Sequence, residues 1–377
     1  MSVGNDLLYL CSCAVNQVSP RHERVAEMDL EKLYALAQSQ SLTALTACAL
    51  EAADGASSRF QEVLLKSIRK NMMLDYERKK LTDFMNEAKI WHLPLKGVLL
   101  QNLYPRAGMR QMSDNDILFD ESRRGDVREY MLRSGYESVR DGDSIVDEYH
   151  KQPLYNFEMH ITLFHPKDEK LPHFHTYYKD IDTRLERERA DSYTMRMTAE
   201  DFYVYLLAHA YKHYTFCGIG IRTLIDFYVY LKAYAETMDW EKIETACEAL
   251  GITEYESQSR ILCRQLFSDP EHIECSEAYA DTLQFYFSSG TYGTLENRVT
   301  NQLQSLGAEK EPVTLSMKLK YLWQRFTLTD AVWERISPFA YRHRWARGFV
   351  RIYHIVRALI TKRKYVRDEF RTLIRKK

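Results

Sequence analysis

The segment Arg110-Gln-Met-Ser-Asp114-Asn-Asp116-Ile-Leu-Phe119 places two acidic side chains at the start of a short apolar run. The run that begins at Asp116 is typical of a short β-strand. Residues two apart on a strand point to the same face, so Asp114 and Asp116 can present both carboxylates to one site. Divalent cations such as Mg²⁺ bind carboxylate oxygens together with substrate phosphates. The segment therefore predicts a metal site at a strand edge.

Upstream, residues 91–95 form a short apolar stretch that predicts a strand, and residues 98–104 suit a helix. Lys96 and Gly97 lie at the turn between them. A residue without Cβ lets the backbone approach a phosphate, amides at a helix N-terminus can bind it, and a lysine adds positive charge. Arg110, four residues before Asp114, could add a bidentate contact to the same phosphates. We expect a phosphate site beside the metal site.

Downstream, the pattern predicts a helix over 123–134, an extended piece from residue 135 and a third strand over 155–164. Glu158 lies mid-strand among apolar neighbours, where an unpaired acid would be costly to bury, so we predict it as the third metal ligand. Asp147 and Glu148, in a neighbouring extended segment, are competitors for this role. His160 shares the face of Glu158 and could contact phosphate, orient a carboxylate or act as a base.

Around this α/β segment the pattern is helical, both over 20–90 and from Thr198 onward, where Thr198-Ala-Glu-Asp resembles a capping box. With 377 residues, of which 45% are hydrophobic, the chain can bury a sizeable core. We predict a mixed α+β fold, a small mixed sheet with flanking helices inside a mostly helical chain. The expected parts are a helical region (1–90), an α/β domain (91–190), a helical domain (191–340) and a basic C-terminal helix (341–377).

The ordered set Lys96-Gly97, Tyr104-Pro105, Arg110, Ser113-Asp114-Asn-Asp116 and Glu158-Met-His160 resembles the DNA polymerase β-type nucleotidyltransferase superfamily. More narrowly, it resembles the bacterial branch of uncharacterised nucleotidyltransferase-like proteins in that superfamily. The resemblance covers about residues 91–165, and extends less specifically to about 236 through Arg222 and Asp226. These last two residues, four apart on a helix, could form an ordinary ion pair or lie on a helical face that closes over the nucleotide.

The resemblance implies a metal-dependent nucleotidyltransferase that transfers a nucleoside monophosphate from a nucleoside triphosphate to an acceptor hydroxyl. Asp114, Asp116 and Glu158 would hold Mg²⁺ or Mn²⁺. The nucleotide, with ATP as the first candidate, would contact the set Lys96, Gly97, Arg110, Ser113, His160, Arg222 and Asp226. The acceptor, whether a small molecule, a protein or RNA, is not named by the sequence.

Two positions depart from the superfamily pattern. Its usual Gly-Ser pair is Gly97-Val98 here, and Asn115 stands between the acids where an apolar residue is usual. The first departure favours an alternative, a protein with the same fold that binds nucleotide or scaffolds a partner without catalysing transfer. A third reading is an enzyme that adds nucleotides to RNA, which predicts salt-dependent RNA binding through the basic end.

The charge is unevenly distributed, although the whole chain carries a net charge of −1. Residues 342–377 hold thirteen lysines or arginines against Asp368 and Glu369, about +11, which leaves about −12 for the rest. Such an end could meet anionic lipid, nucleic acid or an acidic partner, or could pack its apolar stripe on the acidic surface of the protein itself. Seven cysteines without paired spacing and no run of about 18 apolar residues predict a cytoplasmic protein with no transmembrane helix.

Overall fold

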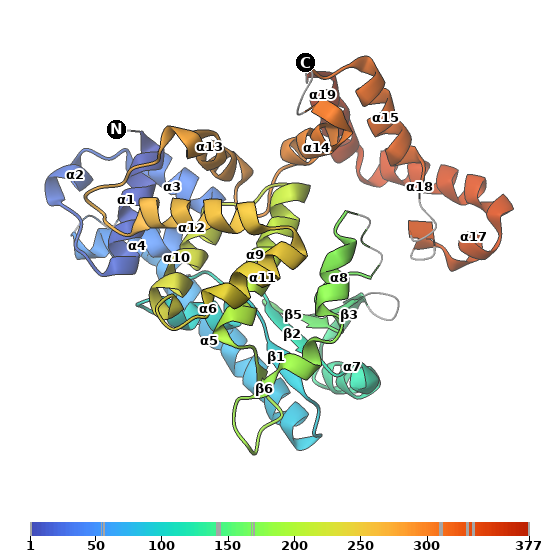
Figure 1. The fold of residues 1–377 in the computed structure, drawn as a ribbon, viewed down its shortest axis with the longest axis horizontal. Helices are drawn as coiled ribbons and strands as arrows, with labels where there is room; N and C mark the ends of the chain where they lie inside the picture. Colours follow the sequence, from blue (N-terminus) through green and yellow to red (C-terminus); the bar gives the residue numbers. More distant parts are fainter. Residues whose placement is uncertain are drawn as a thin grey trace. The chain divides into compact units, whose positions relative to one another are not determined.

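The computed structural model describes residues 2–53, 55, 57–140, 145–166, 168, 170–308, 312–328, 332–333 and 336–375 (Figure 1). By its internal contacts the chain divides into two compact units, described separately below. Unit 1 comprises Met1–Tyr211 and Gly220–Thr291, and unit 2 comprises Lys212–Ile219 and Tyr292–Lys377. The domain boundaries drawn from the sequence at residues 90, 190 and 340 stay predictions.

Five helices precede the sheet in unit 1: α1 (Val3–Asn16), α2 (His22–Ala26), α3 (Leu30–Ser39), α4 (Thr43–Ala52) and α5 (Ser58–Glu87). The helical pattern over 20–90 is confirmed, with four helices. Helix α1 lies in the region predicted as helical (1–90) but before the residues that showed helical spacing, and every residue from Asp6 to Val15 is buried. A helix that is buried all round shows no apolar stripe, so periodicity does not reveal it.

The five strands of the main sheet are β1 (His92–Pro94), β2 (Asn115–Phe119), β3 (Glu137–Arg140), β4 (Val146–Lys151) and β5 (Tyr155–His160). They lie in the order β1-β2-β5-β4-β3, and β2 and β5 run parallel while the other neighbours are antiparallel. The predicted mixed α+β fold is confirmed. The third predicted strand ends at His160 and not at Phe164.

The two faces of the sheet have different chemistry. One face packs on α5 and on α7 (Arg124–Arg133) through a buried cluster of Leu81, Met85, Ile90, Ile117, Phe119, Val127, Met131, Tyr136, Tyr149, Phe157 and Met159. Burying each large apolar side chain stabilises the fold by about 1.5–3 kcal/mol. Side chains alternate along a strand, so Asp116, Glu158 and His160 belong to the opposite face. The apolar face thereby fixes the register that brings the acidic residues together.

Helices α9 to α12 follow the sheet, and the predicted capping of the first is confirmed because the Thr198 hydroxyl accepts a hydrogen bond from the Asp201 amide (3.1 Å). The remaining elements up to residue 291 are α6 (Gly97–Leu100), α8 (Pro172–Tyr178), β6 (Glu186–Arg187), β7 (Met195–Arg196), α9 (Ala199–Phe216), α10 (Arg222–Tyr234), α11 (Trp240–Leu250), α12 (Thr253–Phe267) and α13 (Ala280–Ser289). Short 3-10 helices in this part are η1 (Gln101–Leu103), η2 (Glu121–Arg123), η3 (Ile181–Arg184) and η4 (Glu277–Tyr279).

Among the described residues of unit 2, every regular element is a helix. Its elements are α14 (Leu295–Leu303), the π-helical turn η5 (Gln304–Ala308), α15 (Leu315–Phe326), α17 (Pro338–Arg342), η6 (Arg344–Ala346), α18 (Arg347–Thr361) and α19 (Arg363–Arg375). The basic C-terminal segment, predicted as one helix, thus contains two longer helices, α18 and α19. None of the helices described is long and apolar enough to cross a membrane.

Candidate active site

The turn between β1 and α6 holds Lys96 in a strained conformation. Its φ of 43° and ψ of −112° lie where L residues are uncommon, and the Val98 amide bonds the Leu95 carbonyl across the turn (3.2 Å). Such dihedrals suit glycine at the second position of a type II′ turn, and a side chain there costs about 1–3 kcal/mol. Strain of this kind persists where the surrounding structure compensates for it, as at a functional site.

Gly97 is required by close packing. A Cβ added at Gly97 would lie 2.6 Å from Nη1 of Arg110 and 2.8 Å from Cε of Met112. The helix that begins here, α6, has only four residues, so the helix dipole expected at Gly97 is small. The phosphate contact of Gly97 stays a prediction, and it would depend on local amides more than on a helix dipole.

We expect Gly97→Ala to reduce the free energy of unfolding by about 1–3 kcal/mol, because its methyl group must displace buried side chains. Urea denaturation followed by circular dichroism measures this change. Gly125→Ala is the matched control, since a Cβ there meets nothing within 4 Å and α7 gains a better helix former. Equal stability of the two variants would contradict the packing role of Gly97.

Three side chains lie next to Asp116: those of Lys96, His160 and Glu158. Asp116 and Glu158 are paired directly across the parallel strands β2 and β5. Oδ1 of Asp116 accepts hydrogen bonds from Nζ of Lys96 (2.9 Å) and from Nε2 of His160 (2.8 Å). Oε2 of Glu158 lies 3.8 Å from the same His160 nitrogen. An ionised carboxylate only accepts, so the Asp116 contact assigns a proton to Nε2 of His160.

Lys96, Asp116, Glu158 and His160 form a cluster in which the charge of one residue shifts the pKa of another. The pKa of Asp116 falls, whereas those of Lys96 and Glu158 rise. Burial alone would raise the pKa of Asp116, but the Lys96 ammonium and the His160 hydrogen bond outweigh burial and hold this pKa well below its usual range. Burial likewise opposes the charge of Lys96, yet Asp116 keeps the pKa of Lys96 above its usual value. Burial and the charge of Asp116 raise the pKa of Glu158 to about 7. The cluster therefore concentrates negative charge that a cation would relieve.

Asp114 lies just before β2, close to this cluster but outside its shortest contacts. Burial and the charge of Asp116 raise the pKa of Asp114, while a hydrogen bond from Ser113 lowers it. Asp114 in turn acts on Lys70 of α5: burial lowers the pKa of this half-buried lysine, and the carboxylate partly offsets that effect. Lys70 was not predicted, because on a charged helix no spacing rule sets it apart.

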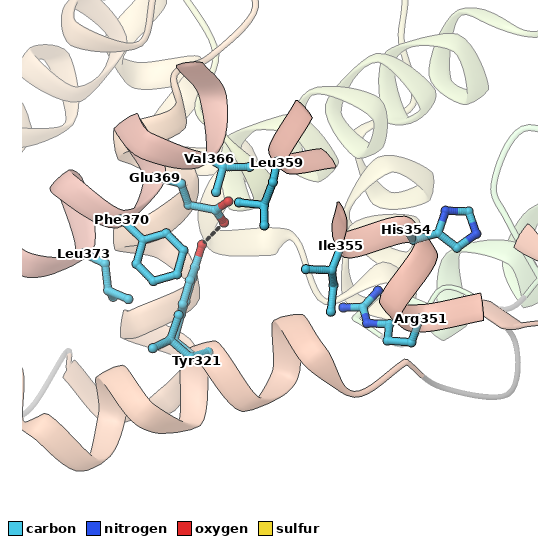
Figure 2. A pocket seen from close by; sticks show the side chains of 10 residues that line it. Tyr321, Arg351, His354, Ile355, Leu359, Val366, Glu369, Phe370 and Leu373 are labelled. Atoms are coloured by element: carbon cyan, nitrogen blue, oxygen red, sulfur yellow. Dashed lines mark hydrogen bonds between the residues drawn. The ribbon is translucent and has the colours of Figure 1, made fainter. Parts of the chain in front are cut away.

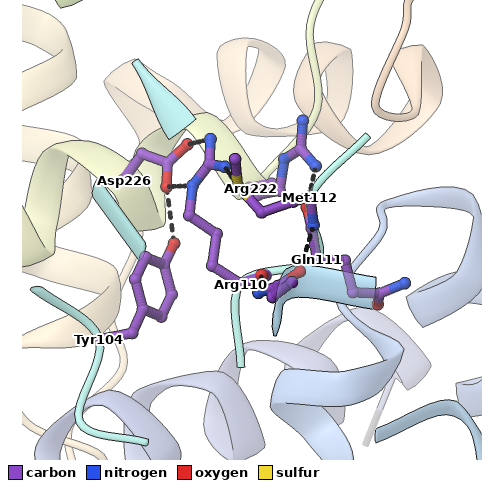
Figure 3. Close-up of polar contacts among 7 residues, drawn as sticks. Tyr104, Arg110, Gln111, Met112, Arg222 and Asp226 are labelled. Atoms are coloured by element: carbon purple, nitrogen blue, oxygen red, sulfur yellow. Dashed lines mark hydrogen bonds and ion pairs between the residues drawn. The ribbon is translucent and has the colours of Figure 1, made fainter. Parts of the chain in front are cut away.

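Arg110 and Asp226 form a buried pair, shown in Figure 3. Nε and Nη2 of Arg110 donate to the two carboxylate oxygens of Asp226 (2.8 and 2.9 Å), and the Tyr104 hydroxyl donates to Oδ1 (2.7 Å). Arg222 donates from Nη1 to the Gln111 carbonyl oxygen (3.2 Å). These bonds join α10 to the loop before β2. Whether Arg110, Arg222 and Asp226 also contact a nucleotide stays a prediction.

The pairing of β4 with β5 places Asp147 and Glu148, the two acids that compete with Glu158 for the role of third metal ligand, on opposite faces of the sheet. Asp147 is paired with Met159 and so belongs to the apolar face, where its carboxylate accepts two hydrogen bonds from Arg124 (2.8 and 2.5 Å). Glu148 is paired with Glu158 itself and shares its face. A contribution of Asp147 to the predicted metal site is thereby excluded by the pleat of the strand.

Helix α9 adds a tyrosine that sequence reasoning missed. Tyr205 is fully buried, and burial raises the pKa of its hydroxyl while the charge of Lys96 opposes the shift and those of Asp116 and Glu158 add to it. Its phenol therefore lies within electrostatic reach of the cluster. In the sequence Tyr205 is one of several aromatic residues in an apolar helix, and nothing in the local pattern distinguishes it.

Among the described residues, one group of three or more possible ligands has its atoms close enough for a metal ion: Asp116, Glu158 and His160, within 4.8 Å of one another. Two carboxylates across neighbouring strands suit a hard divalent cation. His160 already donates to Asp116, so it suits the role of orienting this carboxylate better than that of a ligand. Asp114 is the nearby acid that could complete an oxygen-only set. The residues present therefore fit the metal that the sequence led us to expect.

The mixed sheet carries two acids on adjacent parallel strands beside a Lys-Gly turn, which is the arrangement that the sequence resemblance led us to expect. Comparison with known families agrees with this resemblance: residues 26–268 match a family described as uncharacterised nucleotidyltransferase. Because this match covers more than half of the chain, the protein belongs to that family. No curated protein and no solved structure matches significantly.

Proposed function

We propose that this protein transfers a nucleoside monophosphate from a nucleoside triphosphate, with ATP as the first candidate, to the hydroxyl of an acceptor. The observation that carries the proposal is the direct pairing of Asp116 with Glu158 across β2 and β5, with Lys96 bonded to Asp116. Family membership supports the same chemistry. In the reaction the acceptor oxygen bonds to the α-phosphorus, the bond from that phosphorus to the bridging oxygen breaks, and pyrophosphate leaves.

Asp116 and Glu158, with Asp114, would hold Mg²⁺ or Mn²⁺. A metal bound there would bring triphosphate oxygens to the site and stabilise charge on the attacking and leaving oxygens. The Glu158 side chain is 33% exposed against 9% for Asp116, so its carboxylate is the one that an acceptor hydroxyl can reach and to which it can pass its proton. Lys96 supplies positive charge beside the phosphates, and His160 holds Asp116 in place.

A direct test is isothermal titration of the four nucleoside triphosphates, each with Mg²⁺ or Mn²⁺, into the wild-type protein and into Glu158→Gln. We expect metal-dependent binding of at least one nucleotide, weakened by more than about tenfold in the variant, since losing a ligand should cost at least as much as losing its supporting hydrogen bond. Glu137→Gln, in edge strand β3, is the matched control. Metal-independent binding, or identical binding by the Glu158 variant, would overturn the proposed site.

The second candidate is nucleotide binding without transfer. Val98 after Gly97 supports it, because the serine hydroxyl usual in the superfamily is missing from the phosphate turn. Metal-dependent binding with no release of pyrophosphate, when sugars, protein and RNA are offered as acceptors, would favour this candidate. Pyrophosphate release that requires Glu158 and one class of acceptor would favour transfer and identify the acceptor class.

A further inference from the structure

Helix α18 of unit 2 turns its apolar side outward. Six apolar side chains at helical spacing are between 48% and 73% exposed: Phe349, Ile352, Tyr353, Val356, Leu359 and Ile360. We call these six residues the apolar face of α18. In an amphipathic helix of a globular protein, side chains with this spacing normally pack on the core. Trp345, just before the helix, is also 71% exposed and extends the surface.

The opposite side of α18 is the one that packs within unit 2. Figure 2 shows Arg351, His354 and Ile355 at a cavity of about 400 Å³, which α15 and α19 also line, and Leu359 at the edge of the apolar face reaches the same cavity. Across this cavity the Tyr321 hydroxyl donates to the buried Glu369 carboxylate (2.5 Å). The guanidinium carbon of Arg347 lies 5.8 Å from the ring centroid of Trp333. Unit 2 therefore anchors α18 by a side that carries arginines and leaves the apolar face available to a partner.

Positive charge surrounds the apolar face. From residue 342 to residue 367 the chain contains nine arginines or lysines and no aspartate or glutamate. Exposed cations lie before the helix, on its flank and after it: Arg342, Arg344, Arg357, Lys362, Arg363 and Lys364. An exposed apolar stripe with cations at both ends is complementary to a surface that is apolar inside and anionic outside.

We propose that the apolar face of α18 docks on a membrane surface rich in anionic lipids. Aliphatic and aromatic side chains would enter the boundary between headgroups and acyl chains, while the flanking arginines and lysines contact lipid phosphates. Ile352, Val356 and Ile360 favour lipid over a nucleic acid, because aliphatic side chains cannot stack on bases. With fifteen residues, α18 is too short to span a bilayer and would lie along its surface.

The test is cosedimentation of the 377-residue chain with vesicles of phosphatidylcholine alone or mixed with phosphatidylglycerol. We expect binding to the anionic vesicles, and a fall in the partition coefficient of about tenfold or more in the double variant Ile352→Glu with Val356→Glu. A second variant, Arg363→Gln with Lys364→Gln, changes only exposed charges and should also bind about tenfold more weakly. Circular dichroism checks that each variant stays folded.

The matched control is Leu65→Glu with Met72→Glu on α5, where both apolar side chains are 67% exposed and the charge change is the same. This control should bind vesicles as the wild type does. The proposal is overturned if no vesicle retains the protein, or if the α18 variants bind unchanged. It is overturned as well if light scattering finds a wild-type dimer that the Ile352 and Val356 changes dissociate, or if only RNA is retained by this face.

Discussion

Asp116→Asn is expected to lower nucleotidyl transfer by about a thousandfold, equivalent to about 4 kcal/mol of transition-state stabilisation. Asp116 accepts hydrogen bonds from Lys96 and His160 and is paired across the strands with Glu158. Asparagine keeps the shape but removes the charge that would hold a metal and keep Lys96 in place. The measurement is pyrophosphate release with the best nucleotide and acceptor, compared under saturating metal.

Asp126→Asn serves as the matched control, because Asp126 is an exposed aspartate on α7 that pairs with Arg123. It should leave the rate within about twofold of wild type, as surface ion pairs contribute little. Thermal unfolding must show that Asp116→Asn is folded. A folded Asp116→Asn protein that still releases pyrophosphate at the wild-type rate would show that the chemistry lies elsewhere.

Asp226→Ala is expected to reduce the free energy of unfolding by about 3–5 kcal/mol, since it leaves the buried guanidinium of Arg110 without its bidentate partner. Tyr104→Phe removes one hydrogen bond to the same carboxylate and should cost about 1.5–3 kcal/mol. Urea denaturation of the two single variants and of the double variant gives the coupling free energy between Tyr104 and Asp226. Because both act on one network, the double variant should lose less than the sum of the singles.

The control for this series is Asp83→Ala, which breaks the exposed ion pair with Lys79 (2.6 Å). It should change stability by less than about 1 kcal/mol. If Asp226→Ala were no more destabilising than Asp83→Ala, the contact between α10 and the loop before β2 would not hold unit 1 together. Full additivity of the Tyr104 and Asp226 changes would likewise argue against a shared network.

Much of the candidate site could be predicted because strand geometry is local. The alternation of side chains along a strand grouped Asp114 with Asp116, and Glu158 with His160, before any packing was known. What the alternation could not decide was the neighbour of each strand. The parallel register that sets Asp116 beside Glu158, and Asp147 on the other face, is selected by the apolar cluster packed on α5 and α7.

The partner of Arg110 illustrates a contact that no local rule could supply. The phosphate contact of Arg110, suggested by its distance to Asp114, stays a prediction. In the fold the Arg110 guanidinium pairs with Asp226, 116 residues further along the chain. Pairing over such a distance depends on how α10 packs against the loop before β2. The same holds for Tyr205, whose helix carries it to Lys96 although nothing in its neighbourhood indicates a site.

By itself the sequence determined the mixed α+β class, the family resemblance, the Lys-Gly turn and the acidic strand, because each depends on residue type and spacing within a few residues. Only the tertiary structure decided that potential ligand atoms of Asp116, Glu158 and His160 lie within 4.8 Å of one another, that Arg110 is held by Asp226, and that α18 turns its apolar face outward. These features depend on which surfaces are buried against each other, and burial is a property of the whole folded chain.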